Sequence, residues 1–467
     1  MLTYSFAERD DLPMYEQLYG YIKEDILAGK LLAHEKLPSK RSFSKNLGVS
    51  NTTVETAYGQ LVTEGFLYAL PKRGFFVSPL ERQARPSMGA SKALPAQPAS
   101  GARYVGDFVG GSVATEQFPF SVWLKLLRQV MATEAEETLL TERPAGGLLQ
   151  LRCAISDHLR AFRGMEVSPD QVVVGAGAEY LYSVLIQLLG RGQIYGVEDP
   201  GYLRLSMIYE GNDVSCCHIP MDESGVRMEA LCQSGAEILH ITPSHHNPTG
   251  IVMPAGRRYE LLDWAAEQEG RYIIEDDYDC EFRLSGKPIP TLQSIDEMEK
   301  VIYLNTFSQS LAPAFRISYL VLPEHLARRF YEQLGFYSGT VSCFEQLTLA
   351  RFLSEGYFEK HINRMRNYYR GLRDRLLEEI LRSELGEAVS ISEVHGGLHF
   401  LMEVQTRLSD EELVQRGEQQ GLRISCISQY YHDKALRREH VLVVNYSGIL
   451  PKEISEIVGR LSRCILG

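Results

Sequence analysis

A break in sequence composition divides this 467-residue chain into two folding units. Residues 80–104 are rich in Ala, Pro, Ser and Gly and contain almost no periodic apolar positions, which is typical of a flexible linker. Residues 1–79 suffice for one small domain, and residues 105–467 suffice for a large one with its own core. We expect the last part of the large domain, from roughly residue 340 to residue 467, to form a smaller subdomain.

The small domain has the pattern of three helices followed by a ribbon. Apolar residues at helical spacing begin near Pro13 and end at Gly29, and two short helical stretches follow around Phe43 and Val54. After Gly65, two short apolar runs flank a Pro-Lys-Arg-Gly turn, which predicts a two-stranded ribbon with a basic tip. This order of elements predicts a winged helix-turn-helix domain.

The charge of the small domain differs from that of the whole chain. The net charge of −12 argues against nucleic-acid binding, yet residues 36–79 carry six basic and only two acidic side chains. A solvated basic surface is the simpler explanation, but these charges coincide with a complete helix-turn-helix module. We therefore predict double-stranded DNA as a partner, bound through phosphate contacts and through residues at the start of the second helix. The predicted DNA-binding residues are Ser39, Lys40, Arg41, Lys45, Ser50, Asn51, Thr52, Thr53, Lys72 and Arg73.

The small domain resembles the GntR family of winged-helix regulators. The family pattern is matched by Leu37, Pro38, Ser39, Arg41, Leu47 to Ser50, Thr53, Val54, Ala57, Tyr58, Leu61, Glu64 and Gly65. Family members commonly carry a basic residue after the Val-Ser pair, where this chain has Asn51. The operator sequence therefore cannot be transferred from relatives.

The large domain alternates helical stretches with short β-branched runs, which predicts an α/β fold with a mainly parallel sheet. Helices and strands near the end of the chain predict the smaller C-terminal α+β subdomain. Several polar motifs follow the predicted strands, and the first, Val174 to Tyr180, can hold a phosphate on backbone amides, although a plain glycine turn is the simpler interpretation. Later motifs supply an aromatic ring at Tyr202, an amide at Asn247, and a carboxylate and a phenol at Asp276 and Tyr278.

In this chain order the motifs resemble the fold-type I pyridoxal-phosphate aminotransferases, and together with the small domain they resemble the MocR-type regulators over nearly the full length. The resemblance implies pyridoxal 5'-phosphate as a cofactor, with Asp276 on its pyridine nitrogen and Tyr202 stacked on its ring. It also implies that Asn247 and Tyr278 contact the ring hydroxyl. The residues implied at the phosphate are Gly177, Ala178, Thr306, Ser308 and Arg316.

The resemblance breaks at the lysine that forms a Schiff base with the cofactor, because Gln309 stands in its place. A carboxamide nitrogen is not nucleophilic, so we expect no imine, no catalytic residue and no transamination. Gln309 is either the residue of a natural regulator or a deliberate replacement, and in both cases we expect noncovalent cofactor binding. Val443 stands where aminotransferases often carry a carboxylate-binding arginine, which leaves Arg204 as the candidate ligand-binding residue.

The sequence predicts a transcription regulator whose large domain senses pyridoxal phosphate or its adduct with an amino compound. A true aminotransferase with a DNA-binding appendage is the alternative if Gln309 is engineered, and a ligand-independent dimerisation scaffold is a third interpretation. The resemblance implies a head-to-tail homodimer. No membrane segment, signal peptide or Cys-x-x-Cys pair occurs, and His245 and His246 lack a third ligand, so we expect a cytoplasmic protein without a metal.

Overall fold

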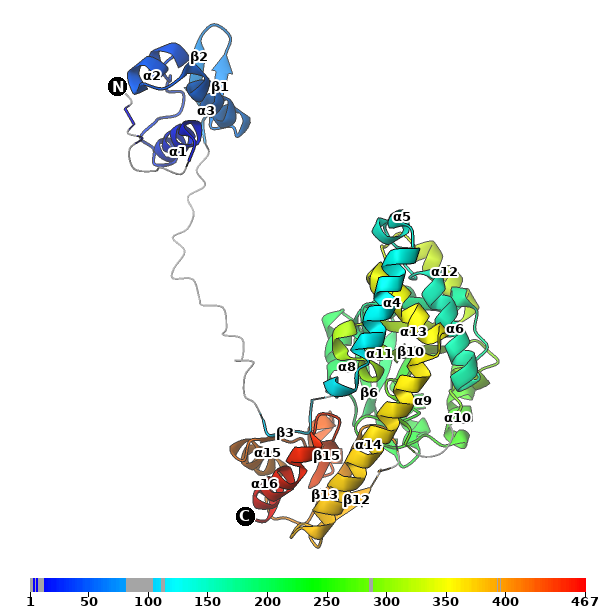
Figure 1. The fold of residues 1–467 in the computed structure, drawn as a ribbon. Helices are drawn as coiled ribbons and strands as arrows, with labels where there is room; N and C mark the ends of the chain where they lie inside the picture. The colour runs from blue at the N-terminus through cyan, green and yellow to red at the C-terminus, as the bar shows by residue number, and fades with distance from the viewer. Residues whose placement is uncertain are drawn as a thin grey trace. The chain divides into compact units, whose positions relative to one another are not determined.

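The fold is described from a computed structural model of the chain (Figure 1). It describes residues 3–4, 6, 12–80, 104–110, 114–284, 289–392, 394 and 396–467, so the predicted linker lies almost wholly outside the described residues. The chain divides into two compact units, residues 1–100 and residues 101–467, which are considered separately.

The N-terminal unit is a winged helix-turn-helix, as predicted. Its elements are α1 (Met14–Leu27), α2 (Lys40–Leu47), α3 (Asn51–Thr63), β1 (Leu67–Leu70) and β2 (Gly74–Val77). Its core contains side chains with no exposed surface, contributed by every helix: Leu18, Ile22, Phe43, Val54, Ala57, Tyr58 and Leu61. The turn between α2 and α3 passes through Gly48, whose φ of 68° lies in the left-handed region that glycine adopts without strain.

The C-terminal unit is built on an eight-stranded sheet with the order β4-β11-β10-β9-β8-β5-β6-β7. The strands are β4 (Val172–Gly175), β5 (Ile194–Asp199), β6 (Ser215–Asp222), β7 (Gly225–Val226), β8 (Ile238–Ile241), β9 (Tyr272–Asp276), β10 (Val301–Thr306) and β11 (Ser318–Val321). All neighbouring pairs from β10 to β6 are parallel, whereas β11 and β7 run antiparallel to their neighbours. The predicted mainly parallel sheet is confirmed.

Helices surround this sheet (Figure 1). They are α4 (Phe120–Thr133), α5 (Glu136–Leu140), α6 (Leu149–Arg163), α7 (Ala178–Leu189), α8 (Leu203–Gly211), α9 (Met228–Ser234), α10 (Ala255–Ala266), α11 (Phe307–Ser310), α12 (Glu324–Leu334) and α13 (Cys343–Ser354). The strands β4, β8 and β10 are buried on both faces, which explains their apolar runs, whereas β6 is half-buried along most of its length.

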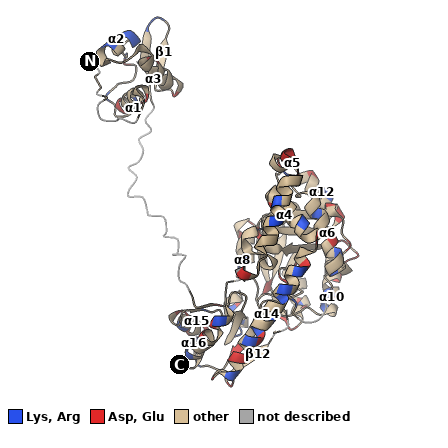
Figure 2. Cartoon of the chain, in the orientation of Figure 1, with Lys and Arg blue, Asp and Glu red and all other residues tan. Residues whose placement is uncertain are grey.

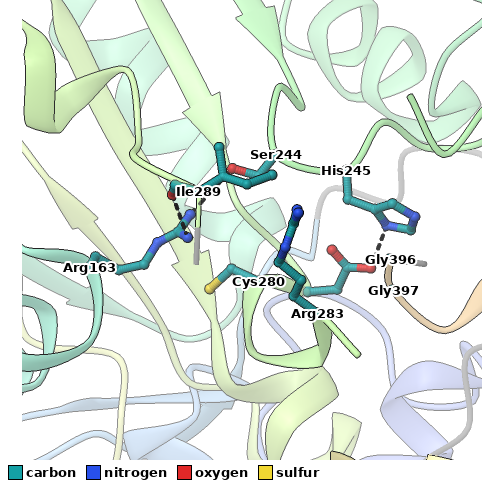
Figure 3. Close-up of a pocket in the computed structure, with 9 residues that line it drawn as sticks. Arg163, Ser244, His245, Cys280, Arg283, Ile289, Gly396 and Gly397 are labelled. Carbon is teal, nitrogen blue, oxygen red and sulfur yellow. Dashed lines mark hydrogen bonds and ion pairs between the residues drawn. The ribbon is translucent and has the colours of Figure 1, made fainter. Parts of the chain in front are cut away.

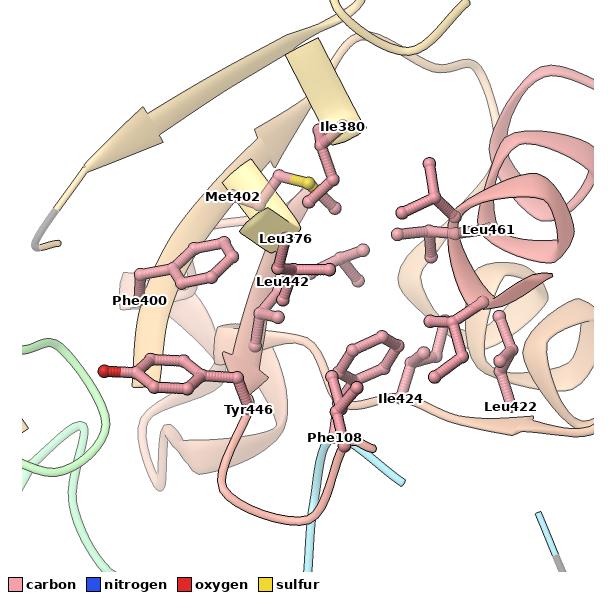
Figure 4. Close-up of a cluster of buried hydrophobic side chains, with 14 of the residues drawn as sticks. Phe108, Leu376, Ile380, Phe400, Met402, Leu422, Ile424, Leu442, Tyr446 and Leu461 are labelled. Carbon is pink, nitrogen blue, oxygen red and sulfur yellow. The ribbon is translucent and has the colours of Figure 1, made fainter. Parts of the chain in front are cut away.

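A smaller α+β subdomain follows, with its own apolar core (Figure 4). It contains α14 (Tyr357–Arg382), α15 (Asp410–Gln419), α16 (Ile454–Leu466), β12 (Val389–Ser392), β13 (His399–Val404), β14 (Leu422–Arg423) and β15 (Val441–Asn445). The strand β3 (Gly106–Asp107) pairs with β14, and the ring of Phe108 lies in this core. The start of the large unit thus belongs to the small subdomain, which differs from the predicted division because a two-residue strand has no periodic signal.

Candidate cofactor site

The predicted cofactor residues follow strands whose carboxyl ends lie at one edge of the large sheet. Tyr202 follows β5, Asn247 follows β8, Asp276 ends β9 and Thr306 ends β10, and these strands are parallel. Two successive antiparallel pairings, β10 with β11 and β11 with β4, bring the end of β4 to the same edge, with Gly177 beyond it. Ligands of open α/β sheets bind at this edge.

Asp276 has one carboxylate oxygen available for a ligand. Its side chain is buried, and its Oδ2 accepts a hydrogen bond of 2.6 Å from the Tyr182 hydroxyl. His240 Nε2 lies 3.5 Å from the same oxygen. Oδ1 is buried and has no hydrogen-bond partner among the described residues, which is costly for a carboxylate. A protonated pyridine nitrogen is the partner that would satisfy it, so this residue fits the implied cofactor.

Glu198, which lies close enough to Asp276 for their charges to interact, and His246, which lies beside Glu198, both have pKa values shifted toward their neutral forms. Burial raises the pKa of Glu198 to about 8, although the hydroxyl and amide of Thr242 donate hydrogen bonds to its carboxyl group. Burial lowers the pKa of His246 to about 3. At the 3.4 Å approach of His246 Nε2 to Glu198 Oε2, burial thus favours the neutral form of both groups.

Tyr278 is held as a neutral phenol beside the predicted ring position. Burial and the nearby Asp279 and Asp276 carboxylates raise its pKa well above the ordinary value, so the hydroxyl keeps its proton for donation. Its oxygen lies 3.3 Å from His245 Nδ1, which lies 2.8 Å from Asp279 Oδ2. Asn247 is half-buried at the carboxyl edge.

The predicted phosphate site combines a close backbone approach with hydroxyl groups and a cation. Gly177 has a φ of 95°, and a Cβ there would lie 2.6 Å from Nη2 of Arg316, so only glycine fits. Ala178 begins α7, whose first backbone N–H groups face this site. Thr306 Oγ1 accepts a 2.8 Å hydrogen bond from Ser318 and donates one of 2.9 Å to Ser308.

Glu179 is a feature of this site that the sequence analysis did not identify. Its Oε2 lies 3.1 Å from Nη2 of Arg316, the predicted phosphate-binding guanidinium. The residue lies in the first turn of α7. The sequence did contain a signal for it: an acidic side chain lies inside the glycine motif that is predicted to bind a phosphate, where a second negative charge is unexpected.

Gln309 occupies a short helical turn that neighbouring residues hold in place. Phe307 is buried, Thr306 caps α11 by accepting a hydrogen bond from the backbone N–H of Ser308, and His361 Nε2 lies 2.8 Å from the carbonyl oxygen of Ser310. The Gln309 side chain is half-buried and forms no hydrogen bond with the described residues. It therefore remains available for a ligand.

The two candidate carboxylate-binding positions differ in exposure. Val443 is buried in β15 and packs with Leu401, Ile427 and Val441, so this position offers a ligand no charge. Arg204 is exposed in the first turn of α8. Burial raises the pKa of the neighbouring Tyr202 phenol, and the positive charge of Arg204 opposes that rise.

A separate small pocket lies next to His245 (Figure 3). Its cavity volume is about 20 Å³, room for about one water molecule, and its lining residues include Arg163, Ser244, Cys280 and Arg283. Arg163 is paired with the Asp277 carboxylate and donates a 2.9 Å hydrogen bond to the carbonyl oxygen of Ile289. None of the predicted cofactor residues lines this pocket, so it is distinct from the predicted cofactor site.

The small domain exposes the start of α3 together with basic residues on α2 and at the ribbon turn (Figure 2). Ser39 and Ser50 each cap a helix by accepting a backbone hydrogen bond. Lys40 forms an ion pair with Glu55, which reduces the charge it can offer to a phosphate. Of the predicted residues, Lys40 and Thr53 are half-buried, and the Thr53 hydroxyl lies 2.8 Å from that of Ser50. The exposed ones are Ser39, Arg41, Lys45, Ser50, Asn51, Thr52, Lys72 and Arg73.

Comparison with known proteins supports both halves of this description. Residues 14–77 match the family model described as bacterial regulatory proteins of the gntR family, and residues 111–460 match that of aminotransferase class I and II. The fold and the site thus define a DNA-binding regulator with an aminotransferase-like domain. The chain belongs to the GntR family of transcriptional regulators, in the MocR-type branch that carries a class I and II aminotransferase domain.

Three relatives that cover most of the chain are named as regulators. The chain is 37% identical to the uncharacterized HTH-type transcriptional regulator YdeL of Bacillus subtilis, with 97% of the chain and 96% of the relative covered. It is 33% identical to the probable rhizopine catabolism regulatory protein MocR of Rhizobium meliloti, with 98% and 95% covered. Identity to the pyridoxine biosynthesis regulator PdxR of Corynebacterium glutamicum is 32%, with 89% and 88% covered.

Solved aminotransferases share the fold of the large domain. The kynurenine aminotransferase of Pyrococcus horikoshii matches with a TM-score of 0.67 and 25% identity, covering 78% of this chain and 91% of that protein. An archaeal alanine:glyoxylate aminotransferase matches with a TM-score of 0.69 and 21% identity, covering 77% and 90%. The fold therefore implies binding of pyridoxal phosphate. None of the described helices is long and apolar enough to span a membrane.

Proposed function

We propose that this regulator binds pyridoxal phosphate, or its adduct with an amino compound, without a covalent bond and responds by changing its affinity for DNA in the cytoplasm. The observation that carries the proposal is the buried, unpartnered Oδ1 of Asp276, combined with glutamine at position 309. The first supplies a partner for a cationic pyridine ring, and the second removes the amine that would form an imine. The chain is accordingly proposed not to transaminate.

The remaining contacts are assigned to this chain's own residues. When bound, the cofactor supplies an electron-withdrawing ring and an aldehyde. Tyr278 and Asn247 would bind its ring hydroxyl, and Tyr202 would cover its face. Amides at Gly177 and Ala178 would bind its phosphate together with the side chains of Thr306, Ser308 and Arg316. Gln309 would contact the aldehyde end, and Arg204 would bind a carboxylate of the amino compound.

A head-to-tail homodimer is part of the proposal. The helix α4 buries Trp123, Leu126 and Val130, while its other face exposes 61% of Phe120 and 60% of Met131. Phe120, Leu124 and Met131 recur at helical spacing along this exposed face, which favours an interaction surface. A dimer formed through this face would carry two DNA-binding domains, one from each copy, which matches paired half-sites in an operator.

The proposal is tested by titrating the purified chain with pyridoxal phosphate. We expect saturable binding with a change of visible absorbance, no adduct after borohydride reduction, and altered affinity for DNA from upstream of its own gene. A response requires different ligand affinities in the two DNA-binding states. If pyridoxal phosphate does not bind, the sensor proposal is wrong, and the large domain is a scaffold or senses another ligand. The alternative function, an aminotransferase, requires that the natural gene encodes lysine at position 309.

Replacing Lys72 and Arg73 by alanine is expected to weaken binding to all DNA sequences about tenfold at physiological salt, since both exposed side chains lie at the ribbon turn and would contact phosphates. The slope of log affinity against log salt should fall by roughly two, which fluorescence anisotropy at several salt concentrations measures. The matched control is Lys30→Ala, because Lys30 is exposed and pairs with Asp25. An unchanged salt slope in the double variant would remove these residues from the interface.

A further inference from the structure

The carboxylate of Glu179 lies in the predicted phosphate site. It forms the 3.1 Å ion pair with Arg316, in which 47% of the glutamate side chain and 51% of the arginine side chain are exposed. The guanidinium is held against Gly177, since its Nη2 would lie 2.6 Å from a Cβ there. The guanidinium thus lies at the start of α7 with a protein carboxylate beside it.

Glu179 is also close to the rest of the predicted cofactor site. Burial is the main cause of the raised pKa of Tyr202, and the charge of Arg204 opposes it. The Glu179 and Asp276 carboxylates raise this pKa further. Glu179 therefore acts electrostatically on the residue predicted to stack on the cofactor ring. Its position in the first turn of α7 is one that favours an anion through the helix dipole. One carboxylate already uses the two features, arginine and helix start, that a phosphate needs.

We infer that Glu179 is a specificity-determining residue that competes with the ligand's phosphate for Arg316. This inference rests on the proposed function, because it concerns the same ligand. A phosphate monoester carries nearly two negative charges at pH 7. To bind Arg316 it must share the guanidinium with the Glu179 carboxylate or displace that carboxylate. Glu179 thereby weakens binding of phosphorylated ligands and leaves binding of unphosphorylated ones nearly unchanged.

The test is the isosteric variant Glu179→Gln, titrated with pyridoxal phosphate and with pyridoxal, which lacks the phosphate. We expect the dissociation constant for pyridoxal phosphate to fall roughly three- to tenfold, because exposed charge interactions are modest. The constant for pyridoxal should stay within a factor of two, and the gain should shrink at high salt. The matched control is Glu166→Gln, since Glu166 forms an exposed 3.0 Å ion pair with Arg160.

A double-variant cycle shows whether the glutamate acts through Arg316. In an Arg316→Gln background, Glu179→Gln should give a smaller gain in pyridoxal phosphate affinity than in the natural background. Equal or weaker binding of pyridoxal phosphate by Glu179→Gln would overturn the inference, as would an equal gain for pyridoxal. If neither the natural chain nor the variant binds pyridoxal phosphate, the proposed function has failed as well, whereas tight binding unaffected by Glu179→Gln refutes only the inference.

Discussion

Replacing Gln309 with lysine is expected to convert noncovalent binding of pyridoxal phosphate into covalent attachment. The helical turn around residue 309 is fixed by the buried Phe307 and by the Thr306 cap, so a lysine should project from the same position as the glutamine. The unprotonated amine of lysine is nucleophilic, whereas a carboxamide nitrogen is not, because its lone pair is delocalised into the carbonyl group. Borohydride reduction followed by mass spectrometry should show one adduct per variant chain and none for the natural chain.

The control for this experiment is Gln309→Arg, which adds the positive charge of a lysine without a nucleophilic amine at neutral pH. It should give no reduced adduct. An adduct at residue 309 in the lysine variant alone would show that the surrounding residues still form a cofactor site. If the lysine variant binds pyridoxal phosphate but forms no adduct, the aldehyde does not lie near residue 309 and our placement of the cofactor is wrong.

Much of this architecture was predictable because each element has a local signal. The helix-turn-helix needs a glycine at the left-handed turn position Gly48 and an N-cap at Ser50, and both are visible in the sequence. The buried parallel strands appear as continuous apolar runs. The carboxyl-edge residues Asp276 and Thr306 follow directly from the ends of those runs.

Other features depend on contacts between distant segments and left no local signal. The placement of Phe108 in the small-subdomain core requires the pairing of β3 with β14, which lies more than 300 residues away in the chain. The hydrogen bond that Tyr182 donates to Asp276 depends on how α7 packs on the sheet. The pairing of Glu179 with Arg316 likewise joins two motifs that the sequence shows only separately.

Replacing Asp276 with asparagine is expected to weaken pyridoxal phosphate binding about 10- to 100-fold, the effect of losing a hydrogen bond to a charged group. The asparagine amide can still accept the Tyr182 hydrogen bond through its oxygen, so the change removes the negative charge and little else. Oδ1 of the natural aspartate is buried without a partner, so the ligand-free variant should be at least as stable to urea as the natural chain. Ligand affinity and stability of the ligand-free protein should therefore respond differently to this change.

This divergence separates a ligand-binding role from a structural one. If Asp276 mainly held the fold together, the asparagine variant would lose stability and ligand binding in parallel. The control is Asp170→Asn, because Asp170 is exposed and forms a 3.0 Å ion pair with Arg152 away from the carboxyl edge. It should leave the dissociation constant unchanged. Since the charge of the pyridine nitrogen is what Asp276 would stabilise, an unchanged affinity in Asp276→Asn would mean that the cofactor ring does not lie against this carboxylate.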